Sequence, residues 1–137
     1  MTASAGARSD VLPVPLPQTI LVVDDDAAMR MILGLTLKGF GYIALAAEDG
    51  KQALQVARDH PEIRVILLDV VMRGLSGKEL ADQLRISLPN AQAVFCSGHP
   101  PETMKLHGLD PDSIHFIQKP CPPPDLHKKI EELLATR

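Results

Sequence analysis

Short apolar runs alternate with amphipathic helical segments from residue 19 to the end of the chain. An apolar run of about four to eight residues with β-branched members is typical of a buried strand. Five such runs are present, at residues 20–23, 42–46, 65–69, 91–96 and 114–117. Chains that alternate in this way fold as a parallel sheet with helices on both faces and right-handed crossovers. The pattern therefore predicts an α/β fold with a doubly wound, five-stranded parallel sheet.

The helical segments differ in the burial that their residues predict. After the first strand, five residues recur at helical spacing and predict a buried face; they are Met29, Ile32, Leu33, Thr36 and Leu37. Asp25 or Asp26 is expected to cap that helix. The segment 99–113 holds only three large apolar residues, Met104, Leu106 and Leu109. We expect this segment to be little buried and of low local stability.

Composition excludes several classes of protein. The chain has 137 residues, is 45% hydrophobic and carries a net charge of −3, which suits one domain and argues against a general nucleic-acid binder. The two cysteines are far apart in the sequence and match neither a disulfide framework nor a zinc motif, so a reducing cytoplasm is expected. No apolar stretch approaches the ~20 residues that a membrane helix needs.

The first 18 residues are small, polar and spaced by prolines, which predicts a flexible N-terminal tail or linker. Pro13, Pro15 and Pro17 interrupt any apolar segment of signal-peptide length. The folded domain is therefore expected to cover residues 19–137.

Polar residues follow four of the expected strands at the point where each strand ends. Asp24 and Asp25 follow the first strand, Asp69 ends the third, Ser97 follows the fourth and Lys119 follows the fifth. In open parallel sheets, the carboxyl ends of the strands form the functional edge. Crowded carboxylates repel one another and resist joint ionisation, and hard cations such as Mg²⁺ prefer oxygen ligands. The sequence therefore predicts a magnesium site at this edge.

The same five residues suit phosphoryl transfer. An aspartate can act as the nucleophile that accepts a phosphoryl group, with a metal to polarise the phosphoryl oxygens. Lys119 and Ser97 would supply donors to those oxygens. Taken singly, each residue has a simpler explanation, since an Asp after a strand is usually a helix cap and Asp26 is expected to be one. Their joint placement on one edge favours a site.

Residues 19–137 resemble a response-regulator receiver domain, the phosphoacceptor module of two-component signalling, similar to CheY. The motifs that carry the resemblance are ILVVDDD at 20–26, VILLDVVMRGLSGKEL at 65–80, VFCSG at 94–98 and FIQKP at 116–120. The resemblance implies a flavodoxin-like sheet with strand order 2-1-3-4-5. The sequences of these motifs are similar to those of receivers of hybrid histidine kinases, which suggests that the chain is a member of a phosphorelay.

The resemblance also implies a role for each site residue. Asp69 would be the phosphorylated residue, with Ser97 and Lys119 contacting the phosphoryl group. Asp24, Asp25 and Asp69 would hold Mg²⁺, with Asp25 a direct ligand and the backbone carbonyl of Val71 another. Ser97 and Phe116 would form the switch.

As a receiver, the chain would take its phosphoryl group from a phosphohistidine on a histidine kinase or a histidine phosphotransfer protein. It would catalyse only its own phosphorylation and dephosphorylation, and so is not expected to be an enzyme. The surface of the fourth helix, fifth strand and last helix would then signal to a protein target. No nucleic-acid partner is expected from the net charge of −3, and no membrane partner is expected because no apolar stretch is long enough to span one. A DNA-binding effector is not expected in this chain, since nothing follows Arg137.

Two alternatives remain open at this point. A haloacid-dehalogenase-type phosphatase would use Asp24 and Asp26 as its Asp-x-Asp pair, but Ala27 and Ala28 follow where that family has Thr or Val. A pseudo-receiver would bind partners without being phosphorylated, although every expected site residue is present.

Overall fold

The computed structural model describes residues 17–70, 72, 76–98, 101–106, 108–110, 114–119 and 121–135. Within these residues, five parallel strands form one sheet: β2 (Thr19–Val23), β3 (Ile43–Ala47), β4 (Ile63–Asp69), β5 (Gln92–Ser97) and β6 (His115–Gln118). The strands lie in the order β3-β2-β4-β5-β6, which is 2-1-3-4-5 in chain order. The predicted fold class and strand order are confirmed.

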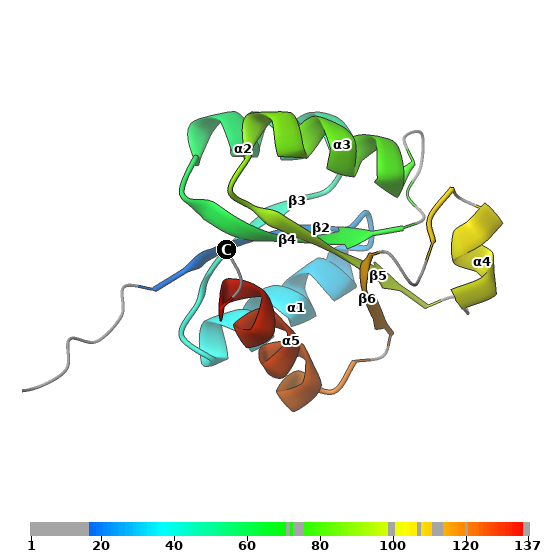
Figure 1. The fold of residues 1–137 in the computed structure, drawn as a ribbon. Coiled ribbons are helices and arrows are strands. Elements are labelled where there is room, and N and C mark those ends of the chain that lie inside the picture. The colour runs from blue at the N-terminus through cyan, green and yellow to red at the C-terminus, as the bar shows by residue number, and fades with distance from the viewer. Residues whose placement is uncertain are drawn as a thin grey trace, which may run out of the picture.

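Helices cover both faces of the sheet. The described helices are α1 (Ala27–Gly39), α2 (Gly50–Asp59), α3 (Gly77–Ser87), α4 (Pro101–Leu106) and α5 (Pro123–Ala135). Figure 1 shows α2 and α3 on one face and α1 and α5 on the other, with α4 apart from both pairs near β5 and β6. No helix within the described residues is both long and apolar enough to cross a membrane.

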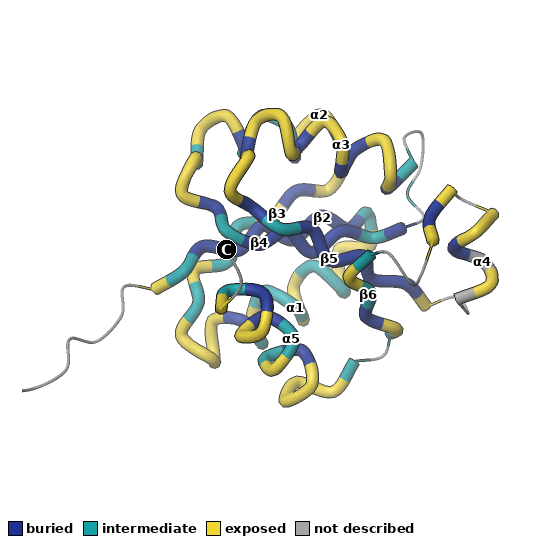
Figure 2. The backbone as a smooth tube through the Cα atoms, viewed as in Figure 1, coloured by how far each residue is buried: buried dark blue, intermediate teal, exposed yellow. Residues whose placement is uncertain are grey.

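The central strands are buried on both faces, as Figure 2 shows. Alternate residues along β2 and β4 enter opposite core layers. Leu21 and Leu68 pack in the layer beneath α2 and α3. Val22 and Leu67 pack in the layer beneath α1 and α5. Each such side chain contributes about 1.5–3 kcal/mol by leaving water, so the ends of these strands are held firmly.

The start of α1 is fixed by Asp26. Its Oδ1 accepts hydrogen bonds from the backbone N–H of Ala28 at 2.9 Å and of Met29 at 3.2 Å. Of the two caps predicted, Asp26 is therefore the one in use, and Asp25 is left for other contacts.

One prediction of burial is wrong. Ile32 was expected on the buried face of α1 but is 54% exposed, and its neighbours Met31 and Leu35 are exposed as well. Because α1 is apolar around most of its circumference, its pattern does not identify one inward face. Around α4, Met104 and Leu109 are buried in the α2/α3 core layer, whereas Glu102, Lys105, Leu106 and Asp110 are exposed, so the described part of the segment 99–113 is little buried, as predicted.

Candidate functional site

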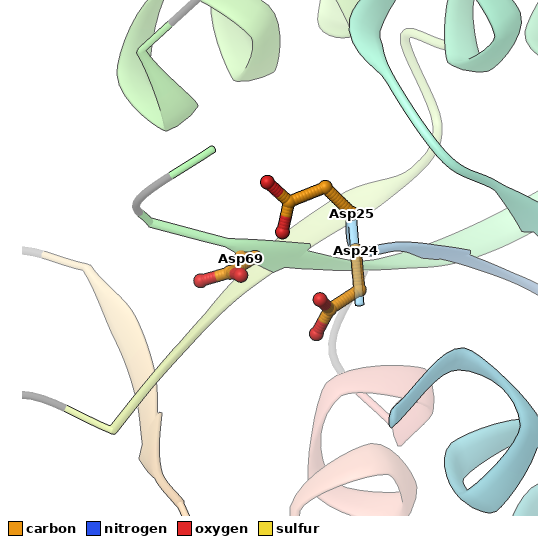
Figure 3. Close-up of side chains that lie close together, drawn as sticks. All are labelled: Asp24, Asp25 and Asp69. Atoms are coloured by element: carbon orange, nitrogen blue, oxygen red, sulfur yellow. The ribbon is translucent and has the colours of Figure 1, made fainter. Parts of the chain in front are cut away.

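Three carboxylates meet at the carboxyl end of the sheet. Asp24 and Asp25 follow β2, and Asp69 ends β4, so the pairing of these neighbouring strands brings them together (Figure 3). One carboxylate oxygen from each lies within 4.8 Å of the others. Asp24 is buried, whereas Asp25 and Asp69 are half-buried. Oxygen donors at this spacing fit a hard divalent cation.

Lys119, directly after the edge strand β6, reaches the same cluster at the carboxyl end of the sheet. Its Nζ donates to Oδ2 of Asp24 at 2.7 Å and lies 3.8 Å from Oδ2 of Asp69. Its own backbone N–H donates to the carbonyl of Ser97 at 2.7 Å, which fixes where the chain leaves β6. Lys119 follows Ile117 by two residues, so it continues the row of side chains in the α1/α5 core layer.

The charges around Lys119 keep it protonated. Burial alone would lower the pKa of its ammonium group. The hydrogen bond to Asp24 and the negative charges of Asp69 and Asp24 outweigh burial and raise that pKa above its ordinary value. A permanent cation therefore faces three carboxylates, and the cluster retains an excess of negative charge that a divalent cation would neutralise.

Asp24 is fixed through both its side chain and its backbone. Its Oδ1 accepts from the backbone N–H of Asp26 at 2.9 Å, and Oδ2 accepts from Lys119. Its backbone N–H donates to the carbonyl of Ala47 at 3.2 Å. Its backbone carbonyl accepts from Nη1 of Arg30 at 2.8 Å.

Arg30 is a residue of the site region that was not predicted from the sequence. It stands one helical turn after the cap Asp26, and its backbone N–H donates to the carbonyl of Asp26 at 2.9 Å. A basic residue four positions after an N-cap faces back toward the loop before the helix, which is the signal that could have drawn attention to it.

The backbone beyond Asp69 lies against the start of α3. A Cβ atom at Gly77 would lie 2.9 Å from the backbone oxygen of Asp69, so only glycine allows this approach. The N–H of Gly77 donates to the carbonyl of Val70 at 3.3 Å, and the N–H of Val70 donates to the carbonyl of Cys96 at 3.1 Å. These contacts fix the backbone directly after Asp69 between β5 and the start of α3.

The remaining predicted residues lie on the adjacent strands. Ser97 ends β5 and is buried. Phe116 lies in β6 beside Phe95 of β5 and packs, half-buried, against the α2/α3 core layer. Val71, predicted to offer a backbone carbonyl to the metal, lies outside the described residues. The same is true of residues 1–16 of the predicted tail.

Known proteins resemble this chain over most of its length. The family model of the response regulator receiver domain matches residues 20–131. The response regulator MprA of Mycolicibacterium vanbaalenii is 35% identical over 121 residues, which cover 88% of this chain and 48% of that protein. The phosphate regulon transcriptional regulatory protein PhoB of Pseudomonas aeruginosa is 34% identical over 123 residues, covering 85% of this chain and 52% of that protein. The chain thus spans about half the length of these curated relatives.

Solved structures share the fold. The receiver domain from the hybrid histidine kinase CckA matches with a TM-score of 0.72 and 29% identity, covering 85% of this chain and 98% of that one. The chemotaxis protein CheY4 of Vibrio cholerae matches with a TM-score of 0.75 and 25% identity, again over 85% of this chain and 98% of that one.

Proposed function

The chain belongs to the response-regulator receiver family, and we propose from that membership that Asp69 accepts a phosphoryl group from a phosphohistidine. The donor would be a histidine kinase or a histidine phosphotransfer protein. The observation that carries the proposal is the convergence of three carboxylates and the Lys119 ammonium at the carboxyl end of the sheet. Receiver domains are signalling modules, and this one would catalyse only its own phosphorylation and dephosphorylation.

Receivers bind Mg²⁺ at an acidic pocket, and Asp24, Asp25 and Asp69 would hold it here. The backbone carbonyl of Val71 is proposed as a further ligand. When bound, Mg²⁺ offsets negative charge on the phosphoryl oxygens. From family membership we assign direct contact to Asp25, and Asp24, whose carboxylate oxygens accept hydrogen bonds from Asp26 and from Lys119, lies beside it.

In the proposed transfer, a carboxylate oxygen of Asp69 attacks phosphorus as the phosphorus–nitrogen bond of the phosphohistidine breaks. The electron pair of that bond goes to the imidazole nitrogen, which leaves with the donor. Lys119 and the hydroxyl group of Ser97 donate hydrogen bonds to the phosphoryl oxygens. The distance of 3.8 Å between Lys119 and Asp69 is short enough for the ammonium to reach an oxygen added there.

The proposed output surface is formed by α4, β6 and α5. Ser97 pairs in register with Gln118 of β6, and Phe95 pairs with Phe116, so a shift of Ser97 toward a phosphorylated Asp69 would act first on β6. We propose residues 19–137 as the receiver unit and residues 1–18 as a tail or linker before it. In this proposal a target protein recognises this surface, and the output involves neither nucleic acid nor membrane.

The phosphatase alternative lacks support from the site geometry. It requires the carboxylate of Asp26 to work beside that of Asp24. The Asp26 carboxylate instead accepts hydrogen bonds from the first turn of α1 and is exposed. The pseudo-receiver alternative is separated from our proposal by a direct assay of phosphorylation.

Incubation with Mg²⁺ and a small phosphodonor such as phosphoramidate should add one phosphoryl group, measured as intact mass. Asp69→Asn should abolish that gain, because the nucleophilic oxygen is lost. The matched variant Asp59→Asn, in the last turn of α2, should be phosphorylated like the parent chain. An unmodified parent chain, or an undiminished gain in Asp69→Asn, would overturn the assignment.

A further inference from the structure

The side chain of Arg30 donates a hydrogen bond to the backbone beside the acidic cluster. Its Nη1 donates to the backbone oxygen of Asp24 at 2.8 Å, and the side chain is only 20% exposed. That oxygen belongs to the peptide bond between Asp24 and Asp25. Because a peptide group is planar, holding its oxygen restrains the orientation of the whole group, whose two flanking Cα atoms carry the side chains of Asp24 and Asp25. The hydrogen bond from Arg30 therefore adds to the contacts that Asp24 makes with Asp26 and Lys119, and it also bears on the backbone of Asp25.

Arg30 also connects the β2–α1 corner with the β3–α2 corner. Its Nη2 lies 3.9 Å from Oε2 of Glu48, which follows β3. The side chain of Glu48 is 60% exposed, so this ion pair contributes little free energy. The backbone N–H of Glu48 donates to Oε1 of Gln52 at 2.7 Å, so the corner is also held by α2. The hydrogen bond to Asp24 is therefore the contact of Arg30 that matters to the site.

We propose that Arg30 is a positioning residue for divalent-cation binding, acting through the peptide between Asp24 and Asp25. The inference rests on the proposed function, since it concerns the same acidic cluster. Arg30 does not touch the bound cation in this proposal. It holds the two carboxylates in the arrangement that the cation requires before the cation arrives.

Charge and geometry predict opposite effects of removing Arg30. Removing a positive charge near an acidic cluster strengthens cation binding by Coulomb attraction. Removing the hydrogen bond releases the peptide, and the loss of such a supporting contact typically weakens metal binding by about tenfold or more. Salt screens the charge effect at this partly exposed position, so we expect the geometric effect to prevail. The sign of the change therefore tests the proposal.

The test compares Arg30→Gln with the matched control Arg58→Gln, which removes the same charge from the last turn of α2. Mg²⁺ affinity is measured by calorimetric titration at a temperature where circular dichroism shows every variant folded. Calorimetry is chosen because the chain has no Trp to report binding by fluorescence. Arg30→Gln should bind Mg²⁺ about tenfold more weakly. Arg58→Gln should bind as the parent chain does.

Arg30→Lys provides a second variant in case Arg30→Gln does not fold, because lysine keeps the charge but loses the planar fork of donors. It should also bind more weakly than the parent chain. Unchanged or tighter binding in both folded Arg30 variants would overturn the role of Arg30 while leaving the proposed function intact. A parent chain that binds no Mg²⁺ and accepts no phosphoryl group would instead overturn the proposed function, and this inference with it.

Discussion

Lys119 Nζ lies 2.7 Å from Asp24 Oδ2, although β4 and β5 separate their strands in the sheet. The contact is made at the carboxyl end of the sheet, past the ends of both intervening strands. It is closer to Asp24 than to Asp69, from which it is 3.8 Å away. In this arrangement Lys119 is the counter-ion of the most buried carboxylate of the cluster.

Lys119→Met should destabilise the chain, because it leaves the carboxylate of Asp24 buried without its cation. Loss of one partner from a buried pair costs about 3 kcal/mol in the free energy of unfolding. Urea denaturation without Mg²⁺ should show this loss. Saturating Mg²⁺ should reduce it, since the cation supplies the missing charge.

The control is Lys78→Met, which removes an exposed partner of Asp82 in α3. It should change the free energy of unfolding by less than about 0.5 kcal/mol. An equal loss for Lys119→Met with and without Mg²⁺ would contradict the proposed placement of the cation beside Asp24.

Mg²⁺ should raise the melting temperature of the parent chain, because it relieves repulsion among three carboxylates that folding brings together. In Asp25→Ala, repulsion is lower from the start, so the variant should melt at a similar or higher temperature without Mg²⁺. It should gain much less from added Mg²⁺ because a direct ligand is missing. Differential scanning calorimetry over a Mg²⁺ series measures both effects, and an undiminished gain in Asp25→Ala would exclude Asp25 as a ligand.

Asp26→Ala should show that the third aspartate of the DDD motif has a different role from Asp24 and Asp25. The variant loses the cap of α1, which costs about 1 kcal/mol in the free energy of unfolding. Its Mg²⁺ affinity and phosphorylation should stay within about twofold of the parent chain, since the backbone N–H that Asp26 donates to Asp24 remains. A large loss of Mg²⁺ affinity would show that Asp26 takes part in the site.

Stability should fall at alkaline pH through Cys96. Burial raises the pKa of its thiol to about 12, whereas an unfolded chain has an ordinary thiol pKa of about 8.5. Between these values the unfolded state loses a proton that the folded state retains, so the thiol's contribution is present below about pH 8.5 and is lost as pH rises. The slope is at most about 1.4 kcal/mol per pH unit.

Urea denaturation of the parent chain and Cys96→Ala at pH 8, 9 and 10 checks this prediction by the difference in slope. Comparison within one pH series removes the contributions of Tyr42 and Lys119, which the two chains share. Cys121→Ala, at a half-buried thiol, should retain most of the parent slope. Parallel slopes for the parent chain and Cys96→Ala would rule out the buried thiol as the cause.

The sheet could be predicted because its signal is local. Runs such as 20–23 and 65–69 are apolar on both faces, and only a strand buried on both sides needs that composition. The positions of Asp24, Asp69 and Lys119 follow from where those runs end. The cap of α1 was left open between two aspartates, because Asp25 and Asp26 are chemically the same and only the turn of the backbone distinguishes them.

Contacts that depend on tertiary packing were not predictable. Counting apolar residues predicted the small burial around α4 but not which side chains, Met104 and Leu109, enter the core. Because α1 is apolar around most of its circumference, the sequence did not show that Ile32 lies on the exposed face of the helix. Arg30 was missed because it binds the backbone carbonyl of Asp24. Every residue has such a carbonyl, so the residue type at position 24 does not indicate a partner for it.

The approach of Gly77 to the backbone of Asp69 has a consequence for protein engineering. Because Val70 and Gly77 are hydrogen-bonded, the two ends of the interval between them are held together independently of the sequence that joins them. A graft of sequence from a relative into this part of the chain therefore needs to preserve the positions of Val70 and Gly77. Gly77 itself is the residue that such a graft must keep, since any side chain there would displace the carbonyl of Asp69.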